Sequence, residues 1–472
     1  MNAHTGSNAM NERGASMPRV FISAAHKSSG KTTLTLGLAA ALHARGHAVQ
    51  PFKKGPDYID PLWLGMAARR PCYNLDFHMM RRDEIEAQFA RAATGARISL
   101  VEGNKGLYDG LDLDGSNSNA ALAKLLDAPV VLVIDARGMT RGVAPLILGY
   151  QAFDRDIRIA GVILNNLGGS RHEAKLRAVI EHYTDVTVIG AVQHDPAMQI
   201  AERHLGLVPA NEADAARERI DRVGERVAAQ VDLDRLLAIA DGAPPRVPAE
   251  SPAAAQPADR LRIAIAHDPA FGFYYAEDLD ALRAANAELV ELDTLRDTAL
   301  PEVDGLVIGG GFPEVFMEQL EANAALRANV KRAIEAGLPT YAECGGLMYL
   351  SKSLSWQDRT CEMVGVVPGD TVMHDRPVGR GYARLEPTGD DRWRESAPIP
   401  AHEFHYSSLE NLPVDSIYAY SVARGHGIDG THDGYQRYNL LAGYVHRRGA
   451  GEQGWIAPFL NQVRAHKARV AA

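Results

Sequence analysis

The chain has 472 residues, of which 46% are hydrophobic and 23% are charged, and its formal net charge is −9 at pH 7. This length predicts two or three domains, and this composition is ordinary for a globular protein. The acidic balance argues against nucleic acid as the default partner, and no apolar run approaches the ~18 residues that would span a membrane.

The N-terminal residues and the cysteines indicate a cytoplasmic protein. Residues 1–16 are polar and small, without the apolar stretch of a secretory signal, so we expect a disordered lead-in before Met17 opens the first patterned segment. The three cysteines (Cys72, Cys344 and Cys361) show no CxxC spacing and cannot form a fully paired framework. Unpaired cysteines favour a reducing cytosol over secretion.

The first half of the chain alternates strand-like and helix-like segments. A β-branched and aromatic run at residues 18–25 ends in a Gly/Ser turn, and a segment of helical composition follows at 33–46. Alternation of this kind predicts an α/β domain with a parallel sheet whose faces are covered by helices. Further strands are predicted at 98–103, 128–136 and 159–166, and the charged, Ala-rich run 211–240 is predicted to be helical.

A phosphate-binding loop is predicted between the first strand and the first helix. The segment AHKSSGKTT (25–33) matches the pattern G-x-x-x-x-G-K-[ST], with Ala25 in place of the first glycine. Backbone N–H groups would hold phosphate oxygens, Lys31 would reach the outer phosphates, and Thr32 would offer a hydroxyl to Mg²⁺. A chance Gly-Lys in a Ser/Gly turn is the alternative, but the strand–loop–helix context favours nucleotide binding. The predicted nucleotide-binding residues of the loop are Ser29, Gly30, Lys31, Thr32 and Thr33.

Two acidic segments support a nucleotide site. Asp57 and Asp60 lie in the Gly/Pro-bounded segment GPDYIDP, and Glu102 follows the strand-like run ISLV. Ligands of open α/β sheets bind at the carboxyl ends of strands, and carboxylates there suit Mg²⁺ or a bound substrate. Acidic residues also favour turns for their own hydrogen bonds, which is the competing interpretation. We predict Thr32, Asp60 and Glu102 as metal ligands, and Asp57, Tyr58 and Asp60 as substrate contacts.

Because the chain is acidic, an anionic substrate would have to be met by local clusters of basic residues. Adjacent basic residues occur at Lys53–Lys54, Arg69–Arg70 and Arg81–Arg82. Most Arg pairs are solvated surface, so these are weak candidates.

A proline-rich segment separates the two halves. Residues 241–259 (DGAPPRVPAESPAAAQPAD) contain five prolines and no cluster of large aliphatic residues. Proline at this density cannot sustain a helix or a central strand, so we predict an extended linker. The domains are therefore predicted at 17–240 and 260–466. The second domain also has the α/β pattern, with strands at 261–267, 305–311, 339–346 and 439–446.

A cysteine in the second half has the setting of a nucleophile. Cys344 lies in AECGGLMYL, with a strand before it and two glycines and an apolar helical run after it. Such an elbow strains the backbone and places a helix N-terminus beside the thiolate. We predict His446, which follows the apolar run LLAGYV, as the base. The predicted oxyanion donors are the N–H groups of Gly310, Gly311 and Gly345.

Other cysteines and histidines have simpler interpretations. A lone cysteine is usually a buried small hydrophobe, and that role suits Cys72 and Cys361. His402, His405 and His426 compete with His446 for the role of base, but we interpret them as shaping the cleft.

The chain carries an ordered series of motifs: SSGKTT, FKKGPDYIDP, EGNKGLYDG, GVILNN followed by RHE, ERHLGLVPA, AFGFYY, GGGFPE, AECGGLMYL, HEFHYS and YVH. On these motifs it resembles the cobyrinic acid a,c-diamide synthases over residues 18–463. The resemblance implies a dethiobiotin-synthetase-like P-loop domain followed by a class I (triad-type) glutamine amidotransferase domain.

The resemblance also implies an activity: a carbon–nitrogen ligase of cobalamin biosynthesis with glutamine as the nitrogen donor. Ammonia released from glutamine at the cysteine would attack a carboxylate that ATP has activated as an acyl phosphate, with Mg²⁺ as cofactor. The expected substrate is an anionic tetrapyrrole, cobyrinate or hydrogenobyrinate, whose a and c acetates become amides. Asn165 in GVILNN would contact adenine. No nucleic acid or membrane is expected as a partner, and a homodimer is one option for the oligomeric state.

Three departures from the family pattern bear on these expectations. Class I amidotransferases usually carry a glutamate two residues after the histidine, where this chain has Arg448, so a Cys–His dyad or a third member from elsewhere is expected. Leu64 replaces a common histidine, and Asn104 and Lys105 replace apolar residues of the EGxxGLYDG segment. Because these last positions are expected beside the substrate, sirohydrochlorin, its nickel form or siroheme is the second choice of ring.

Two other classes of protein compete with this reading. A P-loop partitioning or metal-delivery ATPase would have no need of a Cys–His amidase in the second half. A glutamine hydrolase that serves a separate synthetase would have no need of the phosphate loop.

Overall fold

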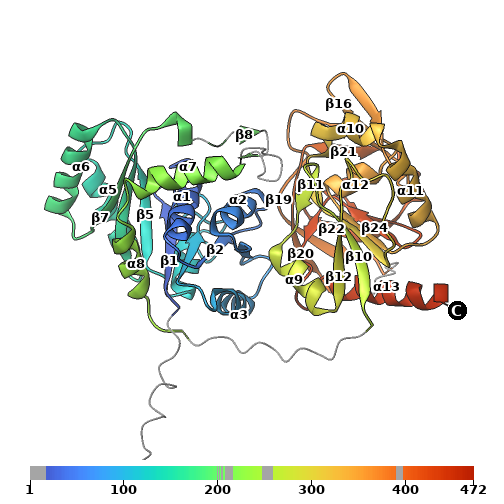
Figure 1. Cartoon of the computed structure of the whole chain (residues 1–472), viewed down its shortest axis with the longest axis horizontal. Coiled ribbons are helices and arrows are strands. Elements are labelled where there is room, and N and C mark those ends of the chain that lie inside the picture. The colour runs from blue at the N-terminus through green and yellow to red at the C-terminus, as the bar shows by residue number, and fades with distance from the viewer. Residues whose placement is uncertain are drawn as a thin grey trace, which may run out of the picture. The chain divides into compact units, whose positions relative to one another are not determined.

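The computed structural model describes residues 17–198, 200, 202–203, 206–207, 216–246, 259–389 and 397–471. The predicted lead-in (1–16) and residues 247–258 of the predicted linker lie outside this part. The chain divides into two compact units, Met1–Pro252 and Ala253–Ala472, which Figure 1 colours from blue to green and from yellow to red.

The first unit is built on a seven-stranded sheet in the order β3-β2-β4-β1-β5-β6-β7. Every neighbouring pair is parallel, which confirms the predicted parallel sheet. Both faces are covered: Val20 and Ile22 of β1 belong to one core cluster and Phe21 to the other. The strands are β1 (Arg19–Ala24), β2 (Val49–Lys54), β3 (Tyr73–Leu75), β4 (Ile98–Glu102), β5 (Val130–Asp135), β6 (Ile159–Leu167) and β7 (Val188–Gln193).

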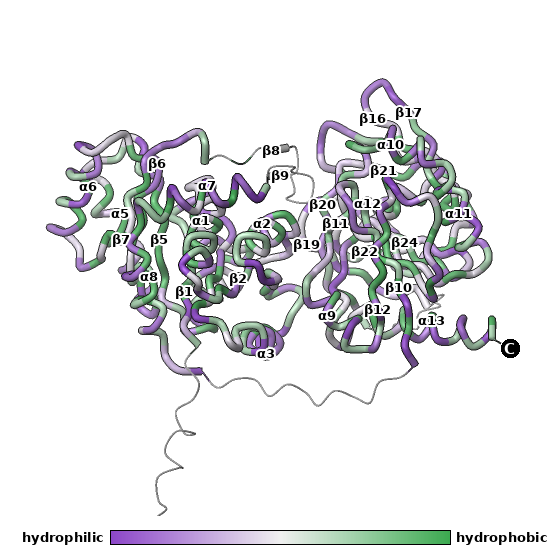
Figure 2. The backbone as a smooth tube through the Cα atoms, viewed as in Figure 1, coloured by the Kyte–Doolittle hydropathy of each residue, from purple (hydrophilic) through white to green (hydrophobic). Residues whose placement is uncertain are grey.

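Helices connect these strands, as the alternating pattern predicts. Hydrophobic colouring follows β5, while α7 is mostly hydrophilic (Figure 2). The described part of the run 211–240 is helical, as predicted, and forms two helices separated at residues 229–232. The helices are α1 (Lys31–Ala44), α2 (Ile59–Ala68), α3 (Arg82–Ala93), α4 (Asn119–Leu125), α5 (Val143–Phe153), α6 (Ser170–Tyr183), η1 (Pro196–Met198), α7 (Ala216–Ala228) and α8 (Leu233–Asp241); the short strands β8 (Glu202–Arg203) and β9 (Gly206–Leu207) pair antiparallel.

The start of the predicted linker packs on the first unit. Helix α8 continues through Asp241. Arg246 donates from Nη1 to the Leu125 carbonyl at 2.9 Å and lies 3.2 Å from the Asp127 carboxylate. Residues 241–246 therefore belong to the folded unit rather than to an extended tether.

The second unit contains a mixed ten-stranded sheet in the order β12-β10-β13-β15-β24-β23-β22-β19-β20-β25. Strands β12 to β24 of this order are parallel, and the others pair antiparallel. The strands are β10 (Leu261–Ala266), β12 (Ala287–Leu292), β13 (Gly305–Ile308), β15 (Thr340–Glu343), β19 (Gly379–Pro387), β20 (Ile399–His405), β22 (Ile417–Arg424), β23 (His432–Arg437), β24 (Leu440–Gly443) and β25 (His446–Arg447).

The rest of this unit covers the two faces of that sheet. Ala264 and Ala266 of β10 belong to one core cluster, and Ile263 and Ile265 to the other. No helix among the described residues is both long and apolar enough to cross a membrane. The remaining elements are α9 (Ala276–Ala284), η2 (Pro313–Phe316), α10 (Met317–Ala322), α11 (Ala324–Glu335), α12 (Gly345–Leu350), α13 (Ile456–Ala471), β11 (Phe271–Phe273) with β14 (Gly310–Gly311), and the small sheet β17 (Arg359–Glu362), β16 (Ser353–Trp356), β18 (Asp370–Met373) and β21 (Ser407–Glu410).

Candidate functional site

The predicted phosphate loop joins β1 to α1 at the carboxyl edge of the first sheet. Gly30 has φ +82°, and a Cβ there would lie 2.2 Å from Asn165 Nδ2, so this position requires glycine. Asn165 Nδ2 donates to the Ser29 carbonyl at 2.9 Å, and the Ser29 hydroxyl donates to the His26 carbonyl at 2.7 Å. Asn165 thus holds the loop in this conformation, and its contact with adenine stays a prediction.

Four side chains converge at the start of α1. The Thr32 hydroxyl donates to Glu102 Oε1 at 2.7 Å and to Asp60 Oδ2 at 3.3 Å. Lys53 Nζ donates to the same two oxygens, at 2.9 Å for Glu102 and 2.5 Å for Asp60. The structure therefore brings together all three predicted metal ligands, and the two carboxylates among them contact one buried ammonium.

Lys53 is a member of this cluster that the sequence analysis assigned only to a weak basic pair. Its neighbour in the sheet is Glu102, since β2 and β4 are parallel and these two residues are in register. The Lys53 and Glu102 side chains are 4% and 0% exposed. Lys53 could have been identified from its position near the carboxyl end of β2, next to β4 in the sheet. That identification requires the strand order, which the sequence alone does not give.

Charge coupling in the cluster shifts several pKa values. Burial lowers the pKa of Lys53, but the carboxylates of Asp60, Glu102 and Asp57 outweigh it and hold that pKa well above its usual value. Burial and the neighbouring Asp60 charge raise the pKa of Asp57 to about 7. Burial lowers the pKa of Lys31 despite the nearby Glu102. Lys53 is therefore a fixed cation, whereas Asp57 titrates near neutral pH.

The substrate-contact residues lie at the start of α2. Asp57 Oδ1 accepts from the N–H groups of Ile59 and Asp60 at 2.9 and 3.1 Å, so it caps this helix, and Asp60 lies in the first helical turn rather than in a loop. Tyr58 is buried. The expectation that Leu64 lies beside the substrate is wrong, because its side chain is fully buried in the hydrophobic core. These contacts leave the substrate roles of Asp57, Tyr58 and Asp60 as predictions.

Cys344 lies at a strained elbow in the second unit. Its φ of 49° is unusual for a residue with a Cβ, and it directly follows β15 and precedes α12. Its N–H donates to the Gly443 carbonyl at 2.7 Å, which ties the elbow to β24. A Cβ on Gly345 would lie 3.0 Å from the Gly311 nitrogen, so the predicted oxyanion loop closely approaches the elbow.

His446 reaches the same place from a different strand. It begins β25, beyond the end of β24, rather than ending the apolar strand as the sequence suggested. A Cβ on Gly310 would lie 2.7 Å from His446 Cε1, so glycine makes room for the ring. Burial lowers the pKa of His446, but its charge interaction and hydrogen bond with Cys344, together with Glu343, raise that pKa to about 10. The structure therefore brings together Cys344, His446 and the glycines predicted as oxyanion donors.

The three competing histidines have other contacts. The His402 ring stacks on His446, with centroids 5.0 Å apart. His405 Nδ1 bonds the Ser407 carbonyl at 2.8 Å, and its Nε2 lies 3.5 Å from Glu403. Glu403 also accepts from the His426 N–H at 2.6 Å. His405 and His426 thus both contact Glu403, and His402 supports the ring of His446.

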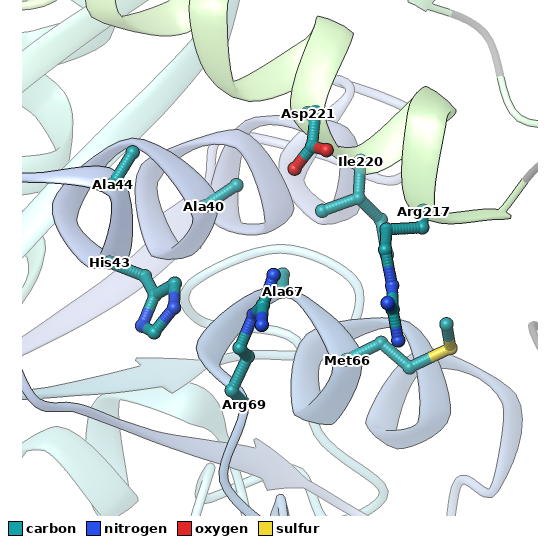
Figure 3. A pocket seen from close by; sticks show the side chains of 9 residues that line it. All are labelled: Ala40, His43, Ala44, Met66, Ala67, Arg69, Arg217, Ile220 and Asp221. Atoms are coloured by element: carbon teal, nitrogen blue, oxygen red, sulfur yellow. The ribbon is translucent and has the colours of Figure 1, made fainter.

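The first unit also contains a pocket lined by residues of α1, α2 and α7 (Figure 3). Its volume is about 570 Å³. The pocket lies at the C-terminal end of α1, about 20 Å along this helix from Lys31. Arg69 lines it. This predicted basic residue therefore lies apart from the acidic cluster. The lining residues are Ala40, His43, Ala44, Met66, Ala67, Arg69, Arg217, Ile220 and Asp221.

Each unit matches a known domain family. Residues 21–208 match the CobQ/CobB/MinD/ParA nucleotide binding domain. Residues 262–452 match the CobB/CobQ-like glutamine amidotransferase domain. The phosphate loop lies in the first match, and Cys344 and His446 lie in the second.

Relatives resemble the chain along nearly its whole length. Cobyrinate a,c-diamide synthase from Magnetococcus marinus is 47% identical over 451 residues, covering 94% of this chain and 96% of the relative. The proteins of that name from Methanosarcina acetivorans and Archaeoglobus fulgidus are 44% and 41% identical, covering 92% and 91% of this chain and 93% and 94% of the relatives. Among solved structures, PurLQS from Thermotoga maritima is 15% identical and covers 44% of this chain and 100% of its own, with a TM-score of 0.33, too weak a likeness to carry an argument.

Proposed function

The chain belongs to the cobyrinate a,c-diamide synthase family, and we propose that it uses ATP and glutamine to convert the a and c acetate side chains of cobyrinate into carboxamides. The shared name of the relatives favours cobyrinate over sirohydrochlorin, its nickel form and siroheme.

One observation carries this proposal: a single chain holds a phosphate loop with a carboxylate–lysine cluster and, in its other unit, a cysteine–histidine couple at a strained elbow. The first set suits activation of a carboxylate by ATP. The second suits release of ammonia from glutamine. A partitioning ATPase would leave the amidotransferase domain without a role.

In the first unit, a substrate carboxylate oxygen attacks the γ-phosphorus of ATP, and the bond from that phosphorus to ADP breaks. The product is an acyl phosphate. Lys31 lies at the start of α1 and places a positive charge at the outer phosphates, while Lys53 adds a fixed cation beside the acidic cluster. Ammonia then attacks the acyl carbon, inorganic phosphate leaves, and a proton is lost to give the carboxamide.

Thr32, Asp60 and Glu102 fit a magnesium ion, because the two carboxylates already bind one cation, the Lys53 ammonium, and the Thr32 hydroxyl lies beside both of them. In the described part of the chain, no group of three His, Cys, Asp or Glu side chains forms a metal site by itself. Magnesium usually takes one or two carboxylates and completes its shell with phosphate oxygens and water. Bound there, it would neutralise charge on the β- and γ-phosphates.

In the second unit, the Cys344 sulfur attacks the amide carbon of glutamine. Backbone N–H groups of Gly310, Gly311 and Gly345 are the proposed donors to the developing oxyanion. His446 takes the thiol proton from Cys344 and gives it to the departing ammonia as the C–N bond breaks. Water then cleaves the thioester to release glutamate.

The proposal is tested by coupling between the products. We expect ADP, phosphate and glutamate to form together when cobyrinate, ATP and glutamine are supplied, with one ADP for each amide made. ATP hydrolysis that proceeds at the same rate without the ring, and without amide formation, would instead support a partitioning ATPase.

A further inference from the structure

The position two residues after His446 holds Arg448, which cannot accept a hydrogen bond from the imidazole. Its guanidinium instead donates from Nε to Glu277 Oε1 on α9 at 2.6 Å. The acid that would orient the histidine must therefore come from another part of the chain, or be missing.

A carboxylate does face the ring. Glu343 Oε2 lies 3.4 Å from His446 Nδ1, and the two side chains are 9% and 4% exposed. The other carboxylate oxygen, Oε1, accepts from the Tyr341 hydroxyl at 2.5 Å and from the Arg447 N–H at 2.9 Å. The two hydrogen bonds to Oε1 therefore fix the carboxylate, while Oε2 faces the imidazole.

We propose that Glu343, the residue immediately before the nucleophile, is the positioning carboxylate of the Cys344–His446 couple. This inference rests on the glutamine hydrolysis proposed above. Glu343 ends β15, and adjacent strand residues point to opposite sides. These two neighbouring residues therefore have different roles. Cys344 at the elbow provides the attacking sulfur, and the Glu343 side chain faces His446.

The carboxylate acts by fixing the tautomer of the ring. An acceptor at Nδ1 keeps the proton there, which leaves Nε2 free to take the thiol proton and later to return it. Its negative charge also stabilises the imidazolium. The Arg447 N–H bond couples Glu343 to β25, so the same carboxylate fixes the backbone that carries His446.

Other acidic groups nearby are engaged elsewhere. Asp278 accepts from the N–H groups of Gly449 and Ala450 at 2.9 and 3.0 Å, and Glu277 binds Arg448. Glu403 contacts His405 and the N–H of His426. These three carboxylates are therefore held by other partners, whereas Glu343 Oε2 faces the His446 ring.

The test compares glutamine hydrolysis by Glu343→Gln, Glu343→Asp and the control Glu277→Gln in the full-length protein. In Glu343→Gln an amide NH₂ can face Nδ1, where it would donate rather than accept and so favour the wrong tautomer. We expect kcat to fall by about 100-fold or more while KM for glutamine is unchanged. Glu343→Asp should recover part of kcat, and Glu277→Gln, which disturbs a different buried pair, should leave kcat near that of the unmodified protein.

Tyr341→Phe provides a second, milder variant. It removes the hydroxyl that holds Oε1 but keeps the aromatic ring, which stacks on Trp455 at 4.1 Å. We expect a kcat loss of a few-fold, with the thermal midpoint of unfolding close to that of the unmodified protein. This variant remains informative even if Glu343→Gln fails to fold.

Two results would overturn the inference. One is full kcat in Glu343→Gln, and the other is a higher KM for glutamine with unchanged kcat in that variant. If Cys344→Ser also kept full glutamine hydrolysis, the proposed function would fail with it. If Cys344→Ser lost that activity while Glu343→Gln kept it, only the role of Glu343 would be wrong.

Discussion

Lys53 Nζ lies 2.9 Å from Glu102 Oε1, the same oxygen that accepts the Thr32 hydroxyl at 2.7 Å. Removing one partner of a buried pair leaves an uncompensated charge, which costs about 3–5 kcal/mol. Lys53→Met should therefore lower the free energy of unfolding by about that amount and abolish amidation with either glutamine or ammonium. Urea unfolding and amide formation measure the two effects.

Lys54→Met is the matched control for this change. Burial lowers the pKa of Lys54 to about 8 despite the charge of Asp76, and its Nζ donates to the neutral Asn104 Oδ1 at 3.5 Å. Because little charge pairing is lost, its unfolding free energy should fall much less than that of Lys53→Met. Equal losses in the two variants would contradict the charge-pair account.

Asp57 gives a prediction about pH. Burial and Asp60 raise its pKa to about 7, so the folded state binds this proton more tightly than the unfolded state does. Stability should therefore fall as pH rises from the ordinary carboxyl pKa to about 7, and Asp57→Asn should remove that fall. Relative to the unmodified protein, Asp57→Asn should raise the thermal midpoint of unfolding little near pH 4 and most above pH 7. The Asp57 side chain is 37% exposed, so solvent reduces the size of this effect. A higher thermal midpoint of Asp57→Asn at low pH only would contradict the predicted pH dependence.

Lys31→Ala should damage amidation with both nitrogen sources, because the charge at the outer phosphates is needed when the acyl phosphate forms. Chromatography of the nucleotides should show ADP and phosphate in the reaction of the unmodified protein. Release of pyrophosphate would mean that the carboxylate is adenylylated and would refute the acyl phosphate route.

Cys344→Ser and His446→Ala should both lose glutamine-driven amidation and keep ammonium-driven amidation, since the first unit needs neither side chain. The two nitrogen sources are compared by measuring carboxamide formation with saturating ATP. A loss of ammonium-driven activity equal to the glutamine-driven loss would contradict this division of labour.

Arg448→Ala is the control for His446. Arg448 contacts Glu277, so its removal should lower stability while glutamine hydrolysis falls far less than in His446→Ala. Full glutamine hydrolysis in His446→Ala would instead indicate His402 as the base, since the His402 ring stacks on the His446 ring.

The alternation of buried strands and helices predicted the α/β class and the parallel first sheet, because hydrophobic pattern and turn residues are local signals. The mixed sheet of the second unit was missed, since its antiparallel strands are paired by contacts between distant segments such as β20 and β25. The same limit hid Lys53 and Glu343. Their roles arise from partners that the fold supplies: a parallel neighbour for Lys53, and a histidine about one hundred residues later in the chain for Glu343.

Leu64 shows the opposite error, in which a position in a family pattern was given too much weight. Leu64 is expected near the substrate because the resembled family commonly has a histidine at this position, but its side chain is fully buried in the hydrophobic core. The run 211–240 ends in helix α8, as expected, and the break between its two helices lies where Val231 bridges to Gly190 in the sheet.

The central claim is that this chain forms two amides on one anionic tetrapyrrole. The proposed site presents one arrangement of carboxylate, phosphate and magnesium, so it should accept acetates and reject propionates, which are longer by one methylene. An apolar pocket discriminates between two ligands that differ by one methylene by only ~1–3 kcal/mol. The selectivity for acetates must therefore come mainly from placing the carboxylate beside the phosphate.

The most direct measurement is mass spectrometry of cobyrinate after incubation with the protein, ATP and glutamine labelled with ¹⁵N at its amide. We expect a product with two labelled carboxamides, both on acetate side chains, and sirohydrochlorin and siroheme unchanged. A product labelled at propionates, or no label in cobyrinate under conditions in which one of the other rings is amidated, would contradict the assignment.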